Sequence, residues 1–127
     1  MAIHHFTRSI HEGKKISIFG DGNSLRDYTY IDDAIEGTLG ALSREHGYQI
    51  YNIGESQTVR LAQLIQIIAE QIGQKAVVEY LPEQPGDVKH TYADIHKARE
   101  HLKYNPQTDI REGLSRFIRW FLDQRWK

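Results

Sequence analysis

The fold of this chain is decided by the stretch IFGDGNSLRDYTYIDD, residues 18–33. Its first two residues end a short apolar run, 16–19, which favours a strand. The tetrapeptide GDGN at 20–23 follows and is the densest turn signal in the chain. Residues 28–31 are β-branched or aromatic and predict a second short strand. The stretch therefore predicts two strands that flank a glycine turn, with Arg26 held between them.

Helical periodicity and terminal residues predict five helices around this stretch, at 2–13, 33–44, 61–73, 94–102 and 109–122. Asp32 or Asp33 is expected to cap the second helix, and Asp109 with Glu112 forms a capping-box pattern for the last. Arg60 stands where a capping serine or threonine would be expected, so the third helix should begin weakly. Further strands are predicted at 49–53 and 76–81, with a brief extension at 91–93. The fold class is α/β, a small mixed unit whose strands do not alternate with helices regularly enough for a doubly wound sheet.

Composition limits the classes of function. A chain of 127 residues with 39% hydrophobic residues has room for one domain. The net charge of −1 gives no indication of a nucleic-acid partner or of an anionic membrane surface. There is no cysteine, which excludes disulfides and thiolate chemistry and fits a cytoplasmic protein. No apolar run approaches the length of a membrane span.

The arginine of the opening stretch has two interpretations. Arg26 follows a glycine turn and could grip a phosphate through two parallel hydrogen bonds. Spacing alone favours a simple ion pair with its neighbour Asp27. The Gly20-x-Gly22 pair does not make a dinucleotide fingerprint, because the third glycine and the following helix are missing.

Other candidate centres are weaker. None of the seven histidines has the spacing of a zinc helix, and no serine lies in a GxSxG elbow. The pair Asp32 and Asp33 could be catalytic acids but suits a helix start better. In the loop 82–87, Asp87 could accept hydrogen bonds from a diol or could simply belong to a turn.

Seven segments in this order resemble the C-terminal half of extended short-chain dehydrogenase/reductases. They are FTRSIHEGKKISIFGDG, RDYTYIDDAIEG, YNIGES, LAQLIQIIAEQIG, LPEQPGDV, TYADIHKA and YNPQTDIREGL. Within that superfamily the chain looks most like NAD-dependent nucleotide-sugar epimerases, especially UDP-glucuronate 4-epimerases. The combination of RDYTYIDD, QPGDV and TYAD carries the specificity, and the resemblance covers essentially the whole chain.

The resemblance implies that residues 1–127 are a substrate-binding lobe that holds the nucleotide end of a UDP-sugar. By position, Ser17 and Phe19 would contact the uracil and nucleoside, and Arg26 would grip the diphosphate. Tyr28 would line the pocket, and Asp87 would hold the ribose. Many UDP-galactose-type epimerases carry an arginine where this chain has Gln84, so the glutamine resembles the glucuronate type and leaves Arg26 as the main phosphate cation.

The resemblance also implies what this chain does not supply. The family's Rossmann domain binds NAD, which transiently oxidises the sugar at C4. Its GxxGxxG turn is not in this sequence, and no tyrosine is followed four places later by lysine. We therefore expect no catalytic residue, no cofactor site and no epimerase activity in the isolated chain.

The resemblance fixes neither the sugar nor the state of assembly. The alternatives are a stand-alone binding or oligomerisation module and the lobe of a nucleotide-sugar 4,6-dehydratase. The surface formed by residues 33–44 and 51–53 would normally pack on the Rossmann domain, which would be the partner of this lobe. Without that domain, we expect a homodimer or a higher oligomer.

Overall fold

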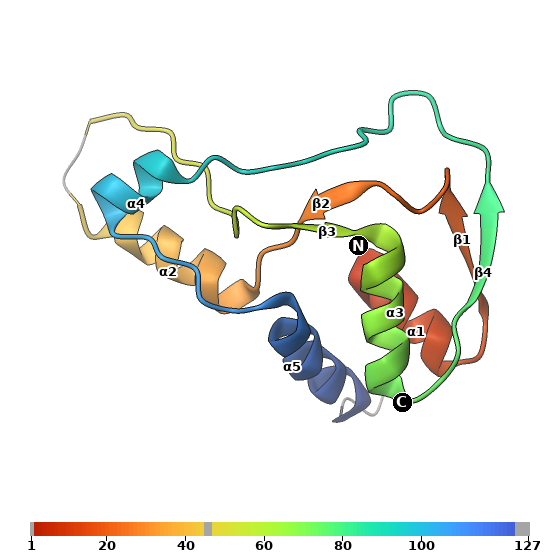
Figure 1. Cartoon of the computed structure of the whole chain (residues 1–127). Coiled ribbons are helices and arrows are strands. Elements are labelled where there is room, and N and C mark those ends of the chain that lie inside the picture. The colour runs from red at the N-terminus through yellow and green to blue at the C-terminus, as the bar shows by residue number, and fades with distance from the viewer. Residues whose placement is uncertain (1, 45–46, 124–127) are drawn as a thin grey trace.

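A computed structural model describes residues 2–44 and 47–123 of the chain (Figure 1). Its elements, in order, are α1 (Ala2–His11), β1 (Lys15–Phe19), β2 (Leu25–Asp27), α2 (Ile31–Leu42), β3 (Thr58–Arg60), α3 (Leu61–Ile72), β4 (Val77–Leu81), α4 (His96–Leu102) and α5 (Ile110–Asp123). The small mixed α/β class predicted from the sequence is confirmed. None of the described helices is long and apolar enough to cross a bilayer.

The strands form two separate pairs. β1 lies parallel to β4, with Lys15 opposite Val77 and Phe19 opposite Leu81. β2 lies antiparallel to β3, and on its other side Leu25 exchanges backbone hydrogen bonds with Lys89 and Thr91. The glycine turn between β1 and β2 is where the sequence predicts it, since Gly20 and Gly22 both have positive φ angles, of 76° and 77°.

A main core fills the space between α1, α3, α5 and one face of β1. Burial alternates along β1, so that Ile16 and Ile18 face the core while Ser17 and Phe19 lie on the outer face. α3 contributes four buried residues, because its apolar positions recur at helical spacing. The core comprises Phe6, Ile10, Ile16, Ile18, Val59, Leu64, Ile65, Ile67, Ile68, Leu114 and Ile118.

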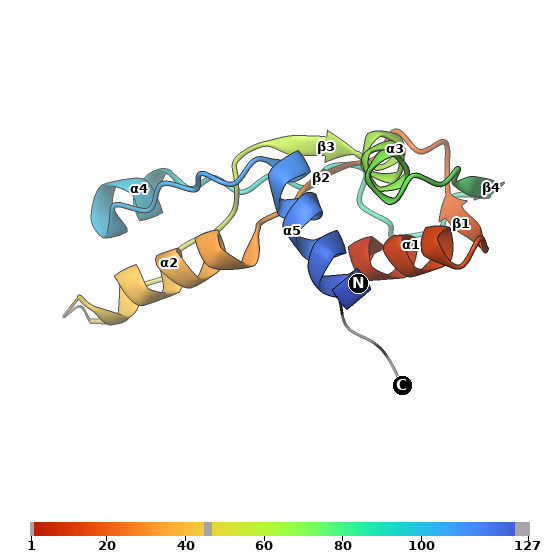
Figure 2. The same ribbon diagram turned by 90° about the horizontal axis from the view of Figure 1, so that it is seen from below.

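A smaller core lies at the other end of the molecule, where α2 and α4 extend away from the helices of the main core (Figures 1 and 2). This minor core comprises Ile95, Ala98, Leu102 and Tyr104. Gly37 allows the close approach of α2, because a Cβ atom there would lie 2.6 Å from Ile53 Cδ1 and 3.1 Å from the Tyr104 ring.

Two strand predictions are wrong. Residues 28–30 are irregular, and Ile31 already belongs to α2. Residues 49–53 form no strand, and none of the backbone hydrogen bonds between described residues outside helices and strands involves them. The three-residue strand β3 was not predicted, because Thr58–Arg60 is too short to show a period.

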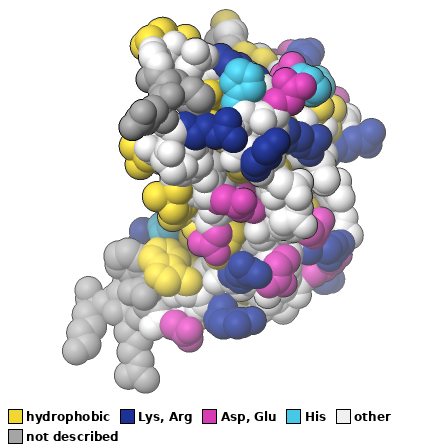
Figure 3. All heavy atoms as spheres, turned by 90° about the vertical axis from the view of Figure 1, so that its left-hand side faces the viewer, with side chains coloured by type: hydrophobic (Ala, Val, Ile, Leu, Met, Phe, Trp, Pro, Cys, Tyr) yellow, Lys and Arg dark blue, Asp and Glu magenta, His cyan; other side chains and the backbone are white. Residues whose placement is uncertain are grey.

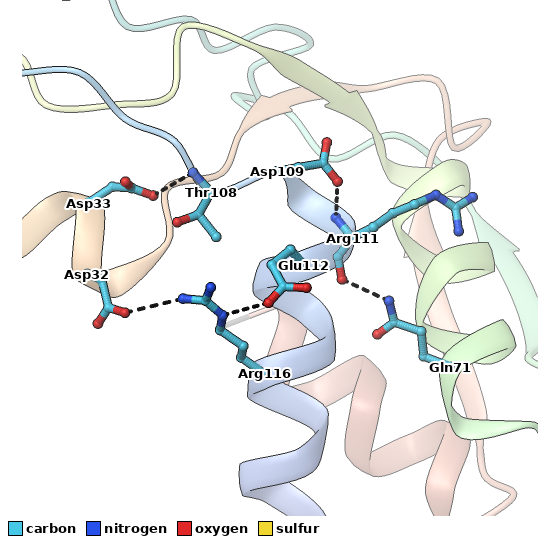
Figure 4. Close-up of polar contacts among 8 residues, drawn as sticks. All are labelled: Asp32, Asp33, Gln71, Thr108, Asp109, Arg111, Glu112 and Arg116. Carbon is cyan, nitrogen blue, oxygen red and sulfur yellow. Dashed lines mark hydrogen bonds and ion pairs between the residues drawn. The ribbon is translucent and has the colours of Figure 1, made fainter.

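The predicted cap of α2 is also wrong. The helix starts after Tyr30, which makes no side-chain capping bond, and Asp32 and Asp33 lie in its first turn. Asp33 is buried and accepts hydrogen bonds from the backbone of Gln107 and Thr108, as the Asp33–Thr108 contact in Figure 4 shows. Asp33 therefore ties α2 to the segment before α5.

The other helix starts follow the sequence more closely. Arg60 occupies the cap position of α3 without a side-chain bond, as expected. The start is not weak, however, because Leu61 N and Ala62 N donate to the carbonyls of Ser24 and Gly22, each at 3.0 Å. Asp109 accepts a bond from Arg111 N at 2.8 Å (Figure 4). Glu112 bonds Arg116 on the next turn at 2.8 Å.

One face of α2 is apolar and exposed. Ile31, Ile35, Leu39 and Leu42 are between 48% and 76% exposed, at spacings that place them on one side of the helix. Hydrophobic side chains reach the surface at this end of the molecule, as Figure 3 shows. We call these four residues the α2 stripe.

Candidate functional site

A cleft opens where the paired strands β1 and β4 end. Because the two strands are parallel, the turn after β1 and the loop after β4 leave from the same edge, and Gly20 N donates to Leu81 O at 2.9 Å. The cleft has a volume of about 140 Å³. It is lined by Phe19, Gly20, Asp21, Asn23 and Ser24 on one side and by Glu83, Gln84, Asp87 and Lys89 on the other.

The glycine turn on the first side is held by its own side chains. Asp21 accepts bonds from the backbone and the side-chain nitrogen of Asn23, each at 2.9 Å. These two bonds hold the pKa of the Asp21 carboxyl below its usual value. The turn is therefore organised without any contribution from a ligand.

Arg26 lies at the border of this cleft and is partly buried. Its guanidinium donates to Asp87 Oδ1 at 2.9 Å and to the carbonyl of Leu25 at 3.0 Å. The expected ion pair with Asp27 is not the one formed. Asp27 instead accepts backbone hydrogen bonds from Glu55, Ser56 and Ala93. Arg26 is thus held by a half-exposed acid of the loop after β4 and stays within reach of an incoming anion.

The cleft has a second cation that the sequence argument did not single out. Lys89 lines the cleft and pairs with Glu83 at 3.1 Å. Its position two residues after Asp87 is the feature of the sequence that could have indicated it. The backbone bond from Leu25 N to Lys89 O then brings this residue beside β2. Two cations, each paired with a loop carboxylate, can exchange those partners for phosphate oxygens.

The six predicted site residues are brought together in part. Phe19, Gln84 and Asp87 line one cleft, and Arg26 joins them through Asp87. Ser17 lies on the same outer face of β1 but below the cleft edge, where its hydroxyl donates to Glu79 at 3.3 Å.

Tyr28 lies apart from that cleft. It lines an apolar hollow of about 550 Å³ between α1, the start of α2 and α5, and burial raises its pKa. A smaller hollow on the other side is shared with Glu55 and residues 106–110.

The glycine turn of the cleft does not have the geometry of a dinucleotide cradle. The turn containing Gly20 and Gly22 leads into β2, whereas a dinucleotide cradle needs a helix N-terminus to face the pyrophosphate. Within residues 2–44 and 47–123 no group of three or more His, Asp or Glu side chains could hold a metal ion either.

Comparisons of the sequence with known proteins agree with one another. Residues 1–54 match the NAD dependent epimerase/dehydratase family. A UDP-glucuronate 4-epimerase of Thermodesulfobacterium geofontis is 45% identical over 121 residues, which are 94% of this chain and 37% of that protein. The chain spans about two fifths of the length of the relatives it matches.

Solved structures give the same result. The structure of MoeE5 in complex with UDP-glucuronic acid and NAD superposes with a TM-score of 0.92 at 31% identity, over 97% of this chain and 42% of that one. A UDP-glucuronic acid 4-epimerase from Bacillus cereus, in complex with UDP-glucuronic acid and NAD, gives 0.87 at 35% identity, over 95% of this chain and 40% of that one. The match lies in the C-terminal portion of these folds.

Proposed function

By sequence and by fold this chain is homologous to the C-terminal lobe of NAD-dependent nucleotide-sugar epimerases, and we propose that it binds the nucleotide end of a UDP-sugar. The carrying observation is the partly buried Arg26 at the cleft border, held 2.9 Å from Asp87. Relatives of this fold are bound to UDP-glucuronic acid in their solved structures, which supports the same ligand class here.

In this proposal the diphosphate of the ligand replaces Asp87 as the partner of Arg26. A guanidinium offers two parallel donors to phosphate oxygens, and Lys89 adds a second positive charge on the loop. Asp87, once released from Arg26, is free to accept hydrogen bonds from the ribose hydroxyls. Phe19 offers a ring that is 40% exposed, on which the uracil can stack, and Ser17 and Gln84 supply nearby polar groups.

The chemistry at the sugar would come from elsewhere. No tyrosine of this sequence is followed four places later by lysine, so we propose that the isolated chain is inactive. Its contribution is binding energy applied at the nucleotide, remote from the reacting carbon. A separate NAD-binding domain is the partner that this role requires, and we expect the cysteine-free chain to work in the cytoplasm.

Calorimetric titration with UDP tests the binding role. Wild type should bind, and Arg26→Ala should bind at least tenfold more weakly, since a hydrogen bond to a charged group contributes about 1.5–3 kcal/mol. Arg8→Ala is the matched control, because Arg8 is an exposed arginine paired with Glu12 on α1. Equal affinities of wild type and Arg26→Ala would overturn the proposal.

The α2 stripe favours a second role, self-association. A contiguous apolar face of this kind on a small protein marks a contact surface. Glu36 lies in the first half of α2, and Arg44 lies just beyond its end. An antiparallel pair of α2 helices that packs Leu39 against Leu42 of the second copy would also bring each Glu36 near Arg44 of the second copy, which makes this part of the stripe self-complementary about a two-fold axis.

Charge reversal tests this second role. Glu36→Arg and Arg44→Glu should each reduce the dimer fraction in light scattering. Mixing the two variants should restore it, because both ion pairs then re-form in the heterodimer, one with the wild-type polarity and one reversed. A monomeric mass for wild type at high concentration would exclude self-association. Loss of the dimer that mixing does not restore would exclude the antiparallel register.

A further inference from the structure

Three carboxylates meet where β2 joins α2, outside the cleft. Asp27 at the end of β2 accepts bonds from Glu55 N at 3.0 Å, Ser56 N at 3.1 Å and Ala93 N at 3.0 Å. One side chain thus fastens two loops, near residues 55 and 93, to the strand that carries Arg26. We call Asp27, Asp33 and Glu55 the acid brace.

Asp33 performs the same task in the first turn of α2. It is only 4% exposed, and its two oxygens accept bonds from Gln107 N at 3.0 Å and Thr108 N at 3.2 Å. Burial disfavours the charged carboxylate, but the hydrogen bonds from Thr108 and Gln107 outweigh it and lower the pKa of Asp33. Asp33 is therefore the ionised member of the brace.

Glu55 is the member with an unpartnered oxygen. Its Oε1 atom is buried and has no hydrogen-bond partner. Glu55 lines a hollow with Thr108, whose backbone nitrogen bonds Asp33 at 3.2 Å, so the Glu55 and Asp33 carboxyls flank the same residue. Asp33, the backbone of Tyr30 and Asp27 all act on the Glu55 carboxyl. Among the described residues, no lysine or arginine forms an ion pair with any of the three acids. Two carboxylates in contact, without a cation, can form a hydrogen bond only if one of them keeps a proton.

We propose that Glu55 retains a proton and donates it to Asp33, and that this proton-linked brace positions β2 and its Arg26. Release of the proton places two negative charges in contact and loosens the loops that Asp27 fastens to β2. The structural half of this proposal stands on the brace alone. Its effect on ligand binding rests on the proposed function.

The direction of the pH dependence follows from the groups that face Glu55. Burial first, and Asp33 next, raise the pKa of Glu55 to about 7. The neighbouring phenol of Tyr104 responds to burial and to the same acids, and its pKa rises to about 12. For an acid whose pKa is raised on folding, the added stability is complete below the unfolded value and is lost as pH rises through the folded value. The brace should therefore weaken between about pH 5 and pH 8.

Thermal unfolding across that pH range tests the brace without any ligand. Wild type should lose stability as pH rises from 5 to 8, and Glu55→Gln should lose much of that dependence, because an amide can donate to Asp33 at every pH. Glu70→Gln is the matched control, because Glu70 is an exposed glutamate of α3 whose hydrogen bonds lower its pKa, so the variant should keep the wild-type profile between pH 5 and 8. All three proteins contain the same seven histidines, so the difference between profiles isolates Glu55. Identical profiles for wild type and Glu55→Gln would overturn the brace.

A direct titration covers the case in which Glu55→Gln does not fold. Carbon-detected NMR of the wild-type glutamate carboxyls should show one group that titrates near neutral pH. Titration of every glutamate below pH 5 would overturn the proposal.

The claim that the brace positions Arg26 is tested by measuring the affinity for UDP as a function of pH. Wild type should bind more weakly as pH rises from 6 to 8, and Glu55→Gln should show a smaller change. If the melting profiles differ but the affinities change in parallel, the brace does not position Arg26. If no variant binds UDP at any pH, the proposed function fails, while the melting profiles still decide on the brace.

Discussion

The two ends of this molecule are built in different ways. Around α1, α3 and α5, eleven buried hydrophobic residues form one continuous core. Around α2 and α4 only four residues are buried together, while the four residues of the α2 stripe face outward. The first end thus has the apolar burial of an independent domain, whereas the second has an apolar face that no described element covers.

Polar contacts fasten the second end to the first. Asp27 and Asp33 accept backbone bonds from three segments, and the Tyr104 hydroxyl donates to the carbonyl of Gly54 at 2.9 Å. Buried hydrogen bonds of this kind specify geometry more than they add stability. We therefore expect the main core to contribute most of the free energy of unfolding. Substitutions around α2 and α4 should change that free energy by smaller amounts.

The largest effect should come from the main core. Leu64 is fully buried, so Leu64→Ala should lower the free energy of unfolding by about 2–5 kcal/mol. Leu39→Ala removes the same atoms from a side chain that is 59% exposed and should change it by less than about 0.5 kcal/mol. Urea unfolding measures both. Equal losses would contradict the contrast between the two ends.

A smaller effect is expected where α2 meets the minor core. Gly37→Ala forces a methyl group against Ile53 and Tyr104 and should cost about 1–3 kcal/mol. At Gly47 nothing lies within 4 Å of an added Cβ, so Gly47→Ala is the control and should be nearly neutral. If Gly37→Ala proved stabilising, as alanine usually is within a helix, the close packing of α2 would be wrong.

The smallest of these effects should follow loss of a single hydroxyl. Tyr104→Phe leaves the Gly54 carbonyl without its donor and should cost about 1 kcal/mol. The comparison variant is Tyr80→Phe, since Tyr80 is 61% exposed. Both variants are compared by denaturant unfolding. If Tyr80→Phe loses more stability than Tyr104→Phe, the contact between Tyr104 and Gly54 does not stabilise the minor core.

The local features of the fold were predictable from the sequence. α3 shows strong apolar periodicity that ends at Gly73, and the GDGN turn contains glycines whose positive φ angles the fold requires. Segments that depend on a partner were not predictable. Residues 49–53 have strand composition but no strand lies beside them, and residues 28–30 are held by packing rather than by a ladder.

The site was predictable only through resemblance. Arg26 and Asp87 are 61 positions apart, so spacing alone pointed to the adjacent Asp27. The same limit hid the role of Asp33, whose partners lie 74 and 75 positions away. Long-range partners are set by the fold, and a single sequence does not display them.

Chemical-shift mapping with UDP tests the central claim most directly. Titration of the isotopically labelled chain should move the amide signals of Gly20, Gly22, Asp87 and Lys89 and the side-chain signal of Arg26. Signals from α4 should stay in place. Arg26→Ala should make these shifts much smaller at the same, subsaturating UDP concentration. Shifts confined to the hollow beside Tyr28, or no shifts in the wild-type chain at millimolar UDP, would contradict the account.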